Sequence, residues 1–338
     1  MATDAWEKFK KFVACEGLVG QGSRVLLAVS GGPDSVCLTH LFHRLKKSAA
    51  LDLIIVHFDH GLRKTACRDA RHVARLGESL GIPVIVETIP VSAFAREEGI
   101  SLETAGRTLR YEGLARLARE HRCTLISTGH TANDNAETLL MWLIRGTGTE
   151  GSAGIPASRT MGKGITLIRP LLSTTRPEIE TYIRRQGLPY VIDRSNFSPD
   201  FTRNRIRHKV IPLLATFNPC LVEHLFTFSR IAHAENAFLE GIVARCLSRS
   251  VQRKKDKIIL DLKRFFGYNK IVQARLIKAL LPEKRSVAQV ERVLAWINDT
   301  TSLKLNYSRL WLLEKKGKKL ILRNAIKYSR THGRNTHI

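Results

Sequence analysis

The sequence predicts an α/β protein built on a parallel sheet with helices on both faces, followed by a smaller, mainly helical basic domain. Three observations support this. Short apolar runs alternate with helical patterns over the first part of the chain, polar motifs stand where those runs end, and positive charge is concentrated in the C-terminal part. With 338 residues the chain is long for a single core, so two domains are expected.

Four apolar runs are predicted to be buried parallel strands. The runs are RVLLAVSGG, LDLIIVHFDHG, IPVIVETIPV and CTLISTGH, and each precedes a segment with the apolar spacing of a helix. A further helical pattern over residues 4–18 precedes the first run. Strands that alternate with helices of this length indicate βαβ units and hence a parallel sheet. Sheets of this kind bind ligands beyond the carboxyl ends of their strands.

The pattern becomes less regular after the fourth strand. Residues 146–175 are rich in Gly, Ser, Thr and Pro, and they are followed by a helical segment, RPEIETYIRRQG, and a polar loop. We expect the segment IPLLATFNP to close a first domain over residues 1–215.

The remaining residues predict a second domain. Residues 221–300 have mainly helical patterns, whereas residues 301–324 alternate apolar and polar side chains around KKGKK, which predicts a hairpin. We therefore expect a mainly helical domain over residues 216–324 and a basic, mobile tail over residues 325–338.

The net charge of +25 is unevenly distributed along the chain. Residues 1–202 hold 26 Lys and Arg against 21 Asp and Glu, a net charge of +5. Residues 203–338 hold 29 against 9, a net charge of +20. A basic surface attracts a polyanion and releases its counterions on binding, so nucleic acid is the leading candidate partner. The alternatives are a solubility feature and an anionic membrane surface.

Cysteine usage and the N-terminus indicate a cytoplasmic protein. None of the six cysteines belongs to a CxxC pair or to a zinc-type spacing, so reduced thiols are expected. The opening residues MATDAWEKFKKF lack an apolar stretch and carry acids, which is unlike a signal peptide. No run of 18 apolar residues exists, so no membrane span is expected.

A phosphate-binding turn is predicted where the first apolar run ends. It consists of Ser30, Gly31, Gly32, Pro33, Asp34 and Ser35. Glycines let the backbone approach a phosphate, and the N-terminus of the following helix presents unpaired N–H groups. Ser30 and Ser35 add hydroxyl donors, and Asp34 either caps the helix or helps to hold a metal ion. The patterns GxxxxGK[ST] and GxGxxG are absent, and a glycine-rich turn without a ligand is the alternative.

Two further groups of polar residues stand near predicted strand ends or helix starts. Asp59 and His60 open the motif DHGLR at the end of the second run. Arg107 and Arg110 share a helical face with Glu103. A pair of arginines can clamp phosphates in a bidentate manner. The alternative for this pair is a solvated face of salt bridges.

The fourth strand is followed by a histidine and two acids. Gly129 and His130 precede a helix, and His130, Asp134 and Glu137 fall on one face of it at i, i+4 and i+7. Carboxylates can hold Mg²⁺ or orient an amine, and a histidine can contact phosphate or carry a proton. Negative charge placed near a helix N-terminus for its dipole is the alternative.

The order SGGxDS after a hydrophobic strand resembles the PP-loop of ATP pyrophosphatases, which cleave ATP between the α and β phosphates. Together with DHGLR and the spacing GHxxxDxxET, it resembles the tRNA(Ile)-lysidine synthase family over residues 26–212. Further matches follow in family order: Arg145-Gly146-Thr147, Gly154-Ile155-Pro156, Arg169-Pro170-Leu171-Leu172, Asp193-Arg194-Ser195-Asn196 and Arg203-Asn204-Arg205-Ile206-Arg207. The resemblance implies a Rossmann-like, adenine nucleotide alpha-hydrolase-like sheet in a catalytic first domain, and it fades after residue 220.

The resemblance also implies a reaction. The C2 oxygen of the first anticodon cytidine of a CAU-reading tRNA(Ile) attacks the α-phosphate of ATP, and pyrophosphate leaves. The amine of free lysine then attacks C2, and AMP departs. The product, lysidine, pairs with A, which changes the codon read from AUG to AUA. ATP, Mg²⁺, free L-lysine and the tRNA are the implied ligands, and the basic second domain is expected to grip the tRNA.

The resemblance assigns roles to particular side chains. The implied nucleotide-binding residues are Ser30, Gly31, Gly32, Pro33, Asp34, Ser35, Asp59, His60, Gly129 and His130. Asp34 is also the candidate ligand for Mg²⁺. A free lysine amine has a pKa of about 10.4, so a carboxylate must accept or hold its proton. Asp134 and Glu137 are the candidates, with Asp59 a third. Arg110 and Arg207 are expected to stabilise charge on the adenylated base and on AMP.

Other readings differ in chemistry. A tRNA 2-thiolase of the same superfamily would typically carry cysteine pairs, and an amide-forming member such as GMP synthetase would need an ammonia source; neither feature is found here. A non-catalytic RNA-binding protein would not need acids in a phosphate site. Longer family members have an additional C-terminal domain that we do not find, which leaves their mode of tRNA clamping in question. A homodimer is left open, and no membrane partner is expected.

Overall fold

The computed structural model describes residues 4–59, 61, 66–162, 164–191, 202–281, 286–308 and 310–324. The backbone divides into two compact units, Met1–His233 and Ala234–Ile338. The division falls within helix α11 (Leu221–Ser250). The functional boundary that we place between residues 215 and 216 stays a prediction, and the predicted tail lies outside the described residues.

The first unit contains a six-stranded sheet in the order β3-β2-β1-β4-β6-β5. Its strands are β1 (Arg24–Ala28), β2 (Asp52–Asp59), β3 (Val84–Thr88), β4 (Leu125–Thr128), β5 (Ser158–Gly162) and β6 (Ile165–Ile168). All neighbours are parallel except β5, which pairs with β6 in the antiparallel sense. The four predicted strands are confirmed, whereas β5 and β6 arise from the Gly-, Ser-, Thr- and Pro-rich segment for which we predicted no strand.

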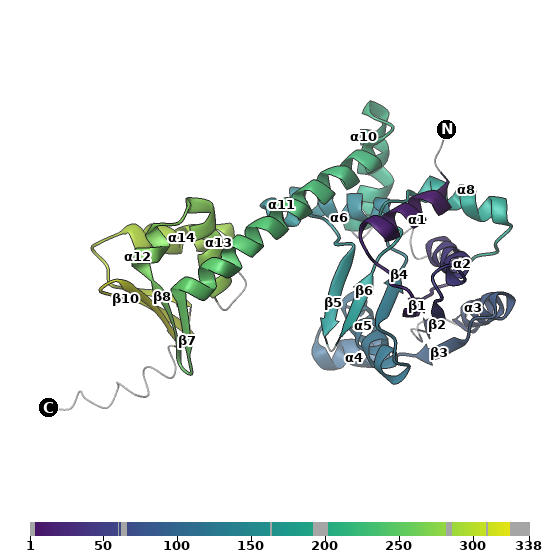
Figure 1. The fold of residues 1–338 in the computed structure, drawn as a ribbon, viewed down its shortest axis with the longest axis horizontal. Helices are drawn as coiled ribbons and strands as arrows, with labels where there is room; N and C mark the ends of the chain where they lie inside the picture. The colour runs from purple at the N-terminus through teal and green to yellow at the C-terminus, as the bar shows by residue number, and fades with distance from the viewer. Residues whose placement is uncertain are drawn as a thin grey trace. The chain divides into compact units, whose positions relative to one another are not determined.

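Helices cover both faces of this sheet (Figure 1). One face packs against α1 (Ala5–Cys15), α2 (Pro33–Lys46), α3 (Ala66–Leu80) and α8 (Arg176–Gln186). The other face packs against α4 (Val91–Glu98) and α5 (Leu102–Glu120). Strand β1 serves both cores, because Val25 and Leu27 face one way and Leu26 faces the other. A strand buried on both faces reads as a continuous apolar run, which is why these strands were predictable.

Apart from the start of α11, the remaining helices of this unit are grouped around α6, which begins shortly after β4. They are α6 (Ala132–Ile144), the short α7 (Thr149–Ser152), α9 (Thr202–Arg205), a π-helical turn (Ile206–Val210) and α10 (Ile211–Phe217). A small apolar cluster of Ala136, Ile206 and Ile211 holds α6 against the π-turn and α10. This packing brings the chain around residue 205 back over α6, a segment distant from it in sequence.

The second unit corrects the expectation of a mainly helical domain. It is organised around a five-stranded antiparallel sheet in the order β7-β8-β11-β10-β9. The strands are β7 (Val251–Lys254), β8 (Lys257–Asp261), β9 (Lys304–Ser308), β10 (Trp311–Lys316) and β11 (Lys319–Asn324). Packed with them are α12 (Leu262–Phe266), α13 (Lys270–Leu280) and α14 (Val287–Asn298). The prediction failed at β7, whose residues VQRK show no apolar alternation, and at β8, whose apolar run is only three residues long.

The predicted hairpin in this unit is confirmed. Strands β10 and β11 pair in the antiparallel sense, with Lys316 opposite Lys319. The turn between them contains Gly317 at φ +55°, a left-handed conformation that glycine adopts without strain. Alternating residues of β11, Leu320 and Leu322, are buried in the core of the unit.

Composition also predicted reduced cysteines and no membrane span. The cysteines whose side chains are described are free; Cys37 and Cys123 are buried, and Cys15 and Cys220 are exposed. Within the described ranges, no single helix is long and apolar enough to cross a membrane. The segments Thr202–Phe217 and Leu221–Ser250 are long and apolar enough only when taken together, and they are bent by 97° relative to each other.

Candidate active site

The candidate site lies where β1 and β4 end side by side. From β1 the chain builds β2 and β3 on one side, and it then returns through β4 on the other side. Open α/β sheets bind ligands at this kind of reversal in strand order. The structure thus brings the predicted turn after β1 next to Gly129 and His130 after β4.

Hydrogen bonds within the turn fix the shape of the predicted phosphate loop. Gly31 has φ +87°, and its carbonyl accepts a hydrogen bond from the Val191 N–H at 2.9 Å. The Ser35 hydroxyl donates to the Gly32 carbonyl at 2.9 Å and lies 3.2 Å from the Ser30 hydroxyl. Gly32 is the N-cap of α2, and it offers no side chain to cap this helix end. Backbone N–H groups of the first turn therefore remain for an anion.

Gly129 follows β4 and lies against the start of α2. A Cβ atom added at Gly129 would lie 3.2 Å from the Asp34 carbonyl carbon and 3.3 Å from the Ser35 backbone nitrogen. Both neighbours are backbone atoms, which cannot rotate away. We conclude that the loop and β4 can be this close only because residue 129 has no side chain.

Replacing Gly129 by alanine is therefore expected to displace the phosphate loop and to raise the KM for ATP by roughly tenfold, because a misplacement of about 1 Å is costly in catalysis. Steady-state kinetics with varied ATP measures the effect. Gly148→Ala is the matched control, since a Cβ at Gly148 meets no atom within 4 Å. An unchanged KM in Gly129→Ala would show that the close approach has no functional consequence.

Asp34 is held by an arginine that sequence reasoning missed. Arg176 donates to one carboxylate oxygen of Asp34 at 2.9 Å, whereas the other oxygen, Oδ1, is buried and has no partner within the described residues. Burial raises the pKa of Asp34 to about 6, although Arg176 acts in the opposite direction. Arg176 opens α8, and the capping box formed by Thr175 and Glu178 fixes this helix start. That T-x-x-E pattern was the available signal.

The raised pKa of Asp34 predicts a pH-dependent gain in stability for Asp34→Asn. The folded state binds the Asp34 proton more tightly than the unfolded state, whose pKa is near 3.8. The ionised carboxylate thus lowers stability progressively as pH rises from about 4 to above 6. Because 21% of the side chain is exposed, we expect at most about 3 kcal/mol at pH 8 and about half of that at pH 5. Denaturant unfolding of both proteins at the two pH values measures this difference; a constant difference would contradict it.

Asp134 and Glu137 meet two arginines in one cluster. Arg203 donates to Glu137 at 2.7 Å and to Asp134 at 3.0 Å. Arg207 donates to Glu137 at 2.5 Å and lies 3.5 Å from Asp134. Only 1% of the Glu137 side chain is exposed. We call these four residues the acid–arginine cluster. It confirms that the two acids share a face, and it adds Arg203, which the sequence showed only within a motif.

The two acids of this cluster have different surroundings. Both Glu137 oxygens accept hydrogen bonds from arginines. One oxygen of Asp134 also accepts from the backbone and hydroxyl of Thr131, which completes the N-terminal capping box of α6. Although burial acts to raise the pKa of Asp134, the charge of Arg203, the backbone hydrogen bond from Thr131 and the charge of Arg207 hold it below its ordinary value. Asp134 is therefore ionised at neutral pH.

His130 lies between the acids and further arginines. Its Nδ1 atom is 2.9 Å from the Thr128 hydroxyl. Burial lowers the pKa of His130 to about 4; Asp134 opposes this shift, and Arg169 and Arg110 add to it. The imidazole is thus neutral at pH 7 and can contact a phosphate only through a neutral N–H group. Burial also lowers the pKa of Arg110.

Other predicted site residues are only partly described. Asp59 ends β2, next to β1, and its carboxylate accepts a hydrogen bond from the Gly61 N–H at 2.8 Å. His60 and residues 62–65 lie outside the described residues, as do residues 192–201. The predicted contact of His60 with nucleotide and the motif over residues 193–196 remain predictions.

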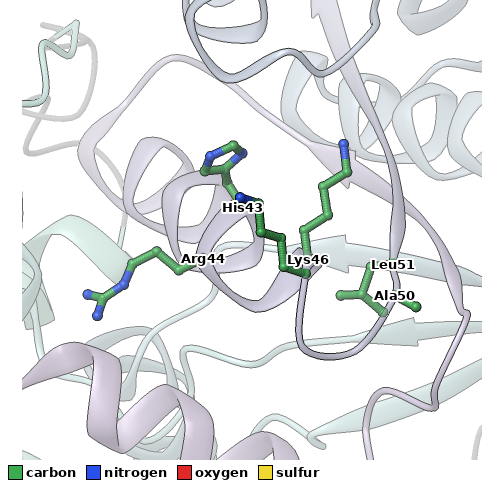
Figure 2. A pocket seen from close by; sticks show the side chains of 6 residues that line it. His43, Arg44, Lys46, Ala50 and Leu51 are labelled. Carbon is green, nitrogen blue, oxygen red and sulfur yellow. The ribbon is translucent and has the colours of Figure 1, made fainter.

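A separate cavity of about 490 Å³ lies at the other end of α2 (Figure 2). It is lined by His43, Arg44, Lys46, Lys47, Ala50 and Leu51. The phosphate loop is at the N-terminus of this helix, roughly 20 Å away along its axis, at about 1.5 Å per residue. We therefore assign the chemistry to the phosphate loop rather than to this cavity.

Comparisons with known proteins agree with this geometry. The family model described as the PP-loop domain matches residues 1–214. The chain is 36% identical to a tRNA(Ile)-lysidine synthase of Dehalococcoides mccartyi over 82% of this chain and 60% of that protein. It is 40% identical to one of Symbiobacterium thermophilum over 76% of this chain and 54% of that protein. The chain thus spans little more than half the length of these relatives.

The fold has a solved counterpart. The U34-tRNA thiolase NcsA from Methanococcus maripaludis, solved with its [4Fe-4S] cluster, matches with a TM-score of 0.58 and 19% identity, over 68% of this chain and 78% of that chain. At this identity the likeness concerns the fold alone. The family match covers the sheet, the phosphate loop and the acid–arginine cluster. The chain belongs to the PP-loop domain family.

Proposed function

We propose that this protein is a cytoplasmic tRNA(Ile)-lysidine synthase, which uses ATP to join lysine to C2 of the first anticodon cytidine of a CAU-reading tRNA. The observation that carries the proposal is the similarity to the two curated lysidine synthases above, at 36% and 40% identity over 82% and 76% of this chain. The matched family domain supports this proposal, because it contains the phosphate loop, the partly buried carboxylate of Asp34 and the acid–arginine cluster.

The phosphate loop suits the release of pyrophosphate. Its uncapped helix N-terminus offers backbone N–H groups to the leaving phosphates. Asp34 Oδ1, which has no protein partner in the described ranges, fits a magnesium ligand. Mg²⁺ commonly takes one or two carboxylates together with substrate phosphates and water. When bound, it would neutralise negative charge on the phosphates.

The acid–arginine cluster suits the second step. Asp134 keeps partial exposure, with 15% of its side chain accessible, and it is the better placed carboxylate to receive the amine of lysine. Glu137 is buried beneath Arg203 and Arg207, so we assign it to holding these arginines in place. Asp59 remains a third candidate, and Arg110 and Arg207 are candidates to stabilise charge on the adenylated base and AMP.

A thiolase is the alternative enzyme. Cys37 packs in the core on one face of the sheet, and Cys123 packs in the core on the other face. These two thiols therefore cannot act as a pair. Among the described residues, no group of three or more His, Cys, Asp and Glu side chains is placed to hold a metal ion. This arrangement favours lysine transfer over sulfur transfer.

The deciding experiment incubates the protein with ATP and labelled lysine, and with tRNA carrying either a CAU or a GAU anticodon. Label is expected only in the CAU tRNA, together with release of pyrophosphate and AMP. The GAU tRNA is the matched control because its first anticodon position holds guanosine instead of the target cytidine. Pyrophosphate release without label in RNA would refute lysine transfer, and incorporation of sulfur from a supplied donor would establish the thiolase.

The second unit is proposed to grip the tRNA, and the KKGKK turn is a candidate contact. Lys315 has a structural role, because its Nζ donates to the carbonyl oxygens of Trp296, at 2.8 Å, and Asp299 near the end of α14. Its ammonium also lies 4.6 Å from the centre of the Trp296 ring. Lys316, Lys318 and Lys319 are exposed. Among the four lysines of this turn, these three have exposed side chains and can reach RNA. The basic pair Lys284 and Arg285 is a further candidate contact, and it lies outside the described residues.

Replacing Lys316, Lys318 and Lys319 together by serine is expected to raise the KM for tRNA roughly three- to tenfold and to leave those for ATP and lysine unchanged. Each lost phosphate contact should also flatten the log–log salt dependence by about 0.9 or less. Kinetics at two salt concentrations measures both effects. Lys315→Ser is the control, for which lower thermal stability is expected instead. An unchanged KM for tRNA at both salts would assign these lysines to solvation.

A further inference from the structure

Four arginines surround one tyrosine beside the candidate site. The guanidinium carbons of Arg107, Arg110 and Arg159 lie 5.2, 5.7 and 5.1 Å from the centre of the Tyr111 ring. Arg169 hydrogen-bonds to the side chain of Tyr111. We call these five residues the arginine–tyrosine cluster. They come from three elements, because α5 supplies three of them, β5 supplies Arg159, and Arg169 directly follows β6.

The cluster concentrates positive charge without a counter-charge from the described residues. In the part of the chain that the structure describes, no carboxylate forms an ion pair with any of its four arginines. Arg169 is only 4% exposed; one of its nitrogens donates to the Pro156 carbonyl at 2.7 Å, and its buried Nε atom has no partner among the described residues. Buried cations without counter-charges are costly. Burial and the neighbouring charges of Arg159 and Arg107 accordingly lower the pKa of Arg169. The arrangement is suited to a polyanion.

The cluster adjoins the reaction centre but lies on the opposite side of β4 from the phosphate loop. The phosphate loop follows β1, whereas Arg169 follows β6, and β4 runs between these two strands. Arg110 and Arg169 are both close enough to His130 to lower its pKa. Arg107 and Arg159 are exposed, so the cluster extends from the buried site to the surface. An extended ligand that enters the site from outside would follow this path.

We propose that the arginine–tyrosine cluster binds the phosphodiester backbone of the single-stranded RNA segment that carries the target base. The inference deepens the proposed function and rests on it. Guanidinium groups packed around an aromatic ring are held in place, and their planar donor forks match phosphate oxygens in a bidentate manner. Arg107 and Arg159 bind the outer phosphates, and Arg169 binds nearer the reacting base. The phosphates of ATP are the alternative ligand for these arginines, but we assign them to the phosphate loop after β1.

The test measures direct binding of a CAU anticodon stem-loop RNA and, separately, of ATP, without requiring turnover. The variant is Arg107→Ala with Arg159→Ala. Its expected RNA affinity is roughly 10- to 50-fold weaker, and its salt slope is flatter by up to about 1.4, or about 0.7 for each single-strand contact. The affinity for ATP is expected to change less than twofold. The control Arg96→Ala with Arg119→Ala removes the same charge from exposed positions on α4 and α5, and less than a twofold change in RNA affinity is expected.

A second double variant distinguishes the effect of guanidinium geometry from the effect of charge alone. Arg107→Lys with Arg159→Lys keeps the charge but loses the planar fork, and a three- to fivefold loss of RNA affinity is expected. Unaltered RNA binding in the alanine variant, or an equal loss in the control, would overturn the proposal. Weakened ATP binding with unaltered RNA binding would assign the cluster to the nucleotide instead. Since binding is read without lysine transfer, failure of the proposed reaction leaves this result interpretable.

Discussion

Replacing Asp34 by alanine is expected to slow pyrophosphate release by roughly 100- to 1,000-fold, the loss typical of removing one preorganised electrostatic group, and to leave tRNA binding within about twofold. The physical reason is the position of its carboxylate at the start of α2, with one oxygen tied to Arg176 and the other without a partner in the described structure. Release of pyrophosphate from labelled ATP in the presence of tRNA measures the first quantity, and filter binding of tRNA measures the second.

The controls for Asp34→Ala separate chemistry from folding. Asp52→Ala removes a carboxylate that also pairs with an arginine, Arg24, but at an exposed position. Exposed pairs contribute about 0–1 kcal/mol, so this control should retain near-normal pyrophosphate release. Equal loss of tRNA binding and pyrophosphate release in Asp34→Ala would point to misfolding, and unaltered release would remove Asp34 from the reaction.

The parts of the fold that could be predicted are those with a local pattern. Strands β1, β2 and β4 are buried on both faces, so each appears as an apolar run before a turn. Strand β5 could not be found in this way, because it is an edge strand whose residues, SRTMG, are mostly exposed. Likewise, β7 has three exposed residues among four and no apolar alternation. Both strands are defined by their partners rather than by their own composition.

In the candidate site, too, residues with a local sequence pattern could be predicted, whereas their partners from distant segments could not. The helical face shared by Asp134 and Glu137 follows from their spacing of three residues, and the phosphate loop follows from its glycines and the helix after it. Their arginine partners come from distant segments: Arg203 is 66 residues from Glu137, and Arg176 is 142 residues from Asp34. Such pairings depend on the packing of α8 and α9, which no local pattern encodes.

Glu137→Gln is expected to slow lysine transfer more than adenylation, so that adenylated tRNA accumulates. Glutamine keeps the shape of the side chain but removes the charge that balances Arg203 and Arg207. Both guanidinium groups then depend on Asp134, which becomes a weaker base for the amine of lysine. The proposed adenylation step uses the phosphate loop instead, so its rate is expected to change less. Rapid quench with labelled ATP and lysine resolves the two steps.

The same substitution is expected to lower the free energy of unfolding by about 2–3 kcal/mol, because it leaves two partly buried arginines with an uncharged partner. The matched control is Glu120→Gln on α5, which breaks an exposed pair with Arg116 and should cost less than about 0.5 kcal/mol. The ratio of the two rates makes the kinetic result independent of this loss of stability, since partial unfolding lowers both steps equally. If both steps slow by the same factor and no adenylated tRNA accumulates, Glu137 only maintains the fold, and the amine must be received by Asp134 or Asp59 without its help.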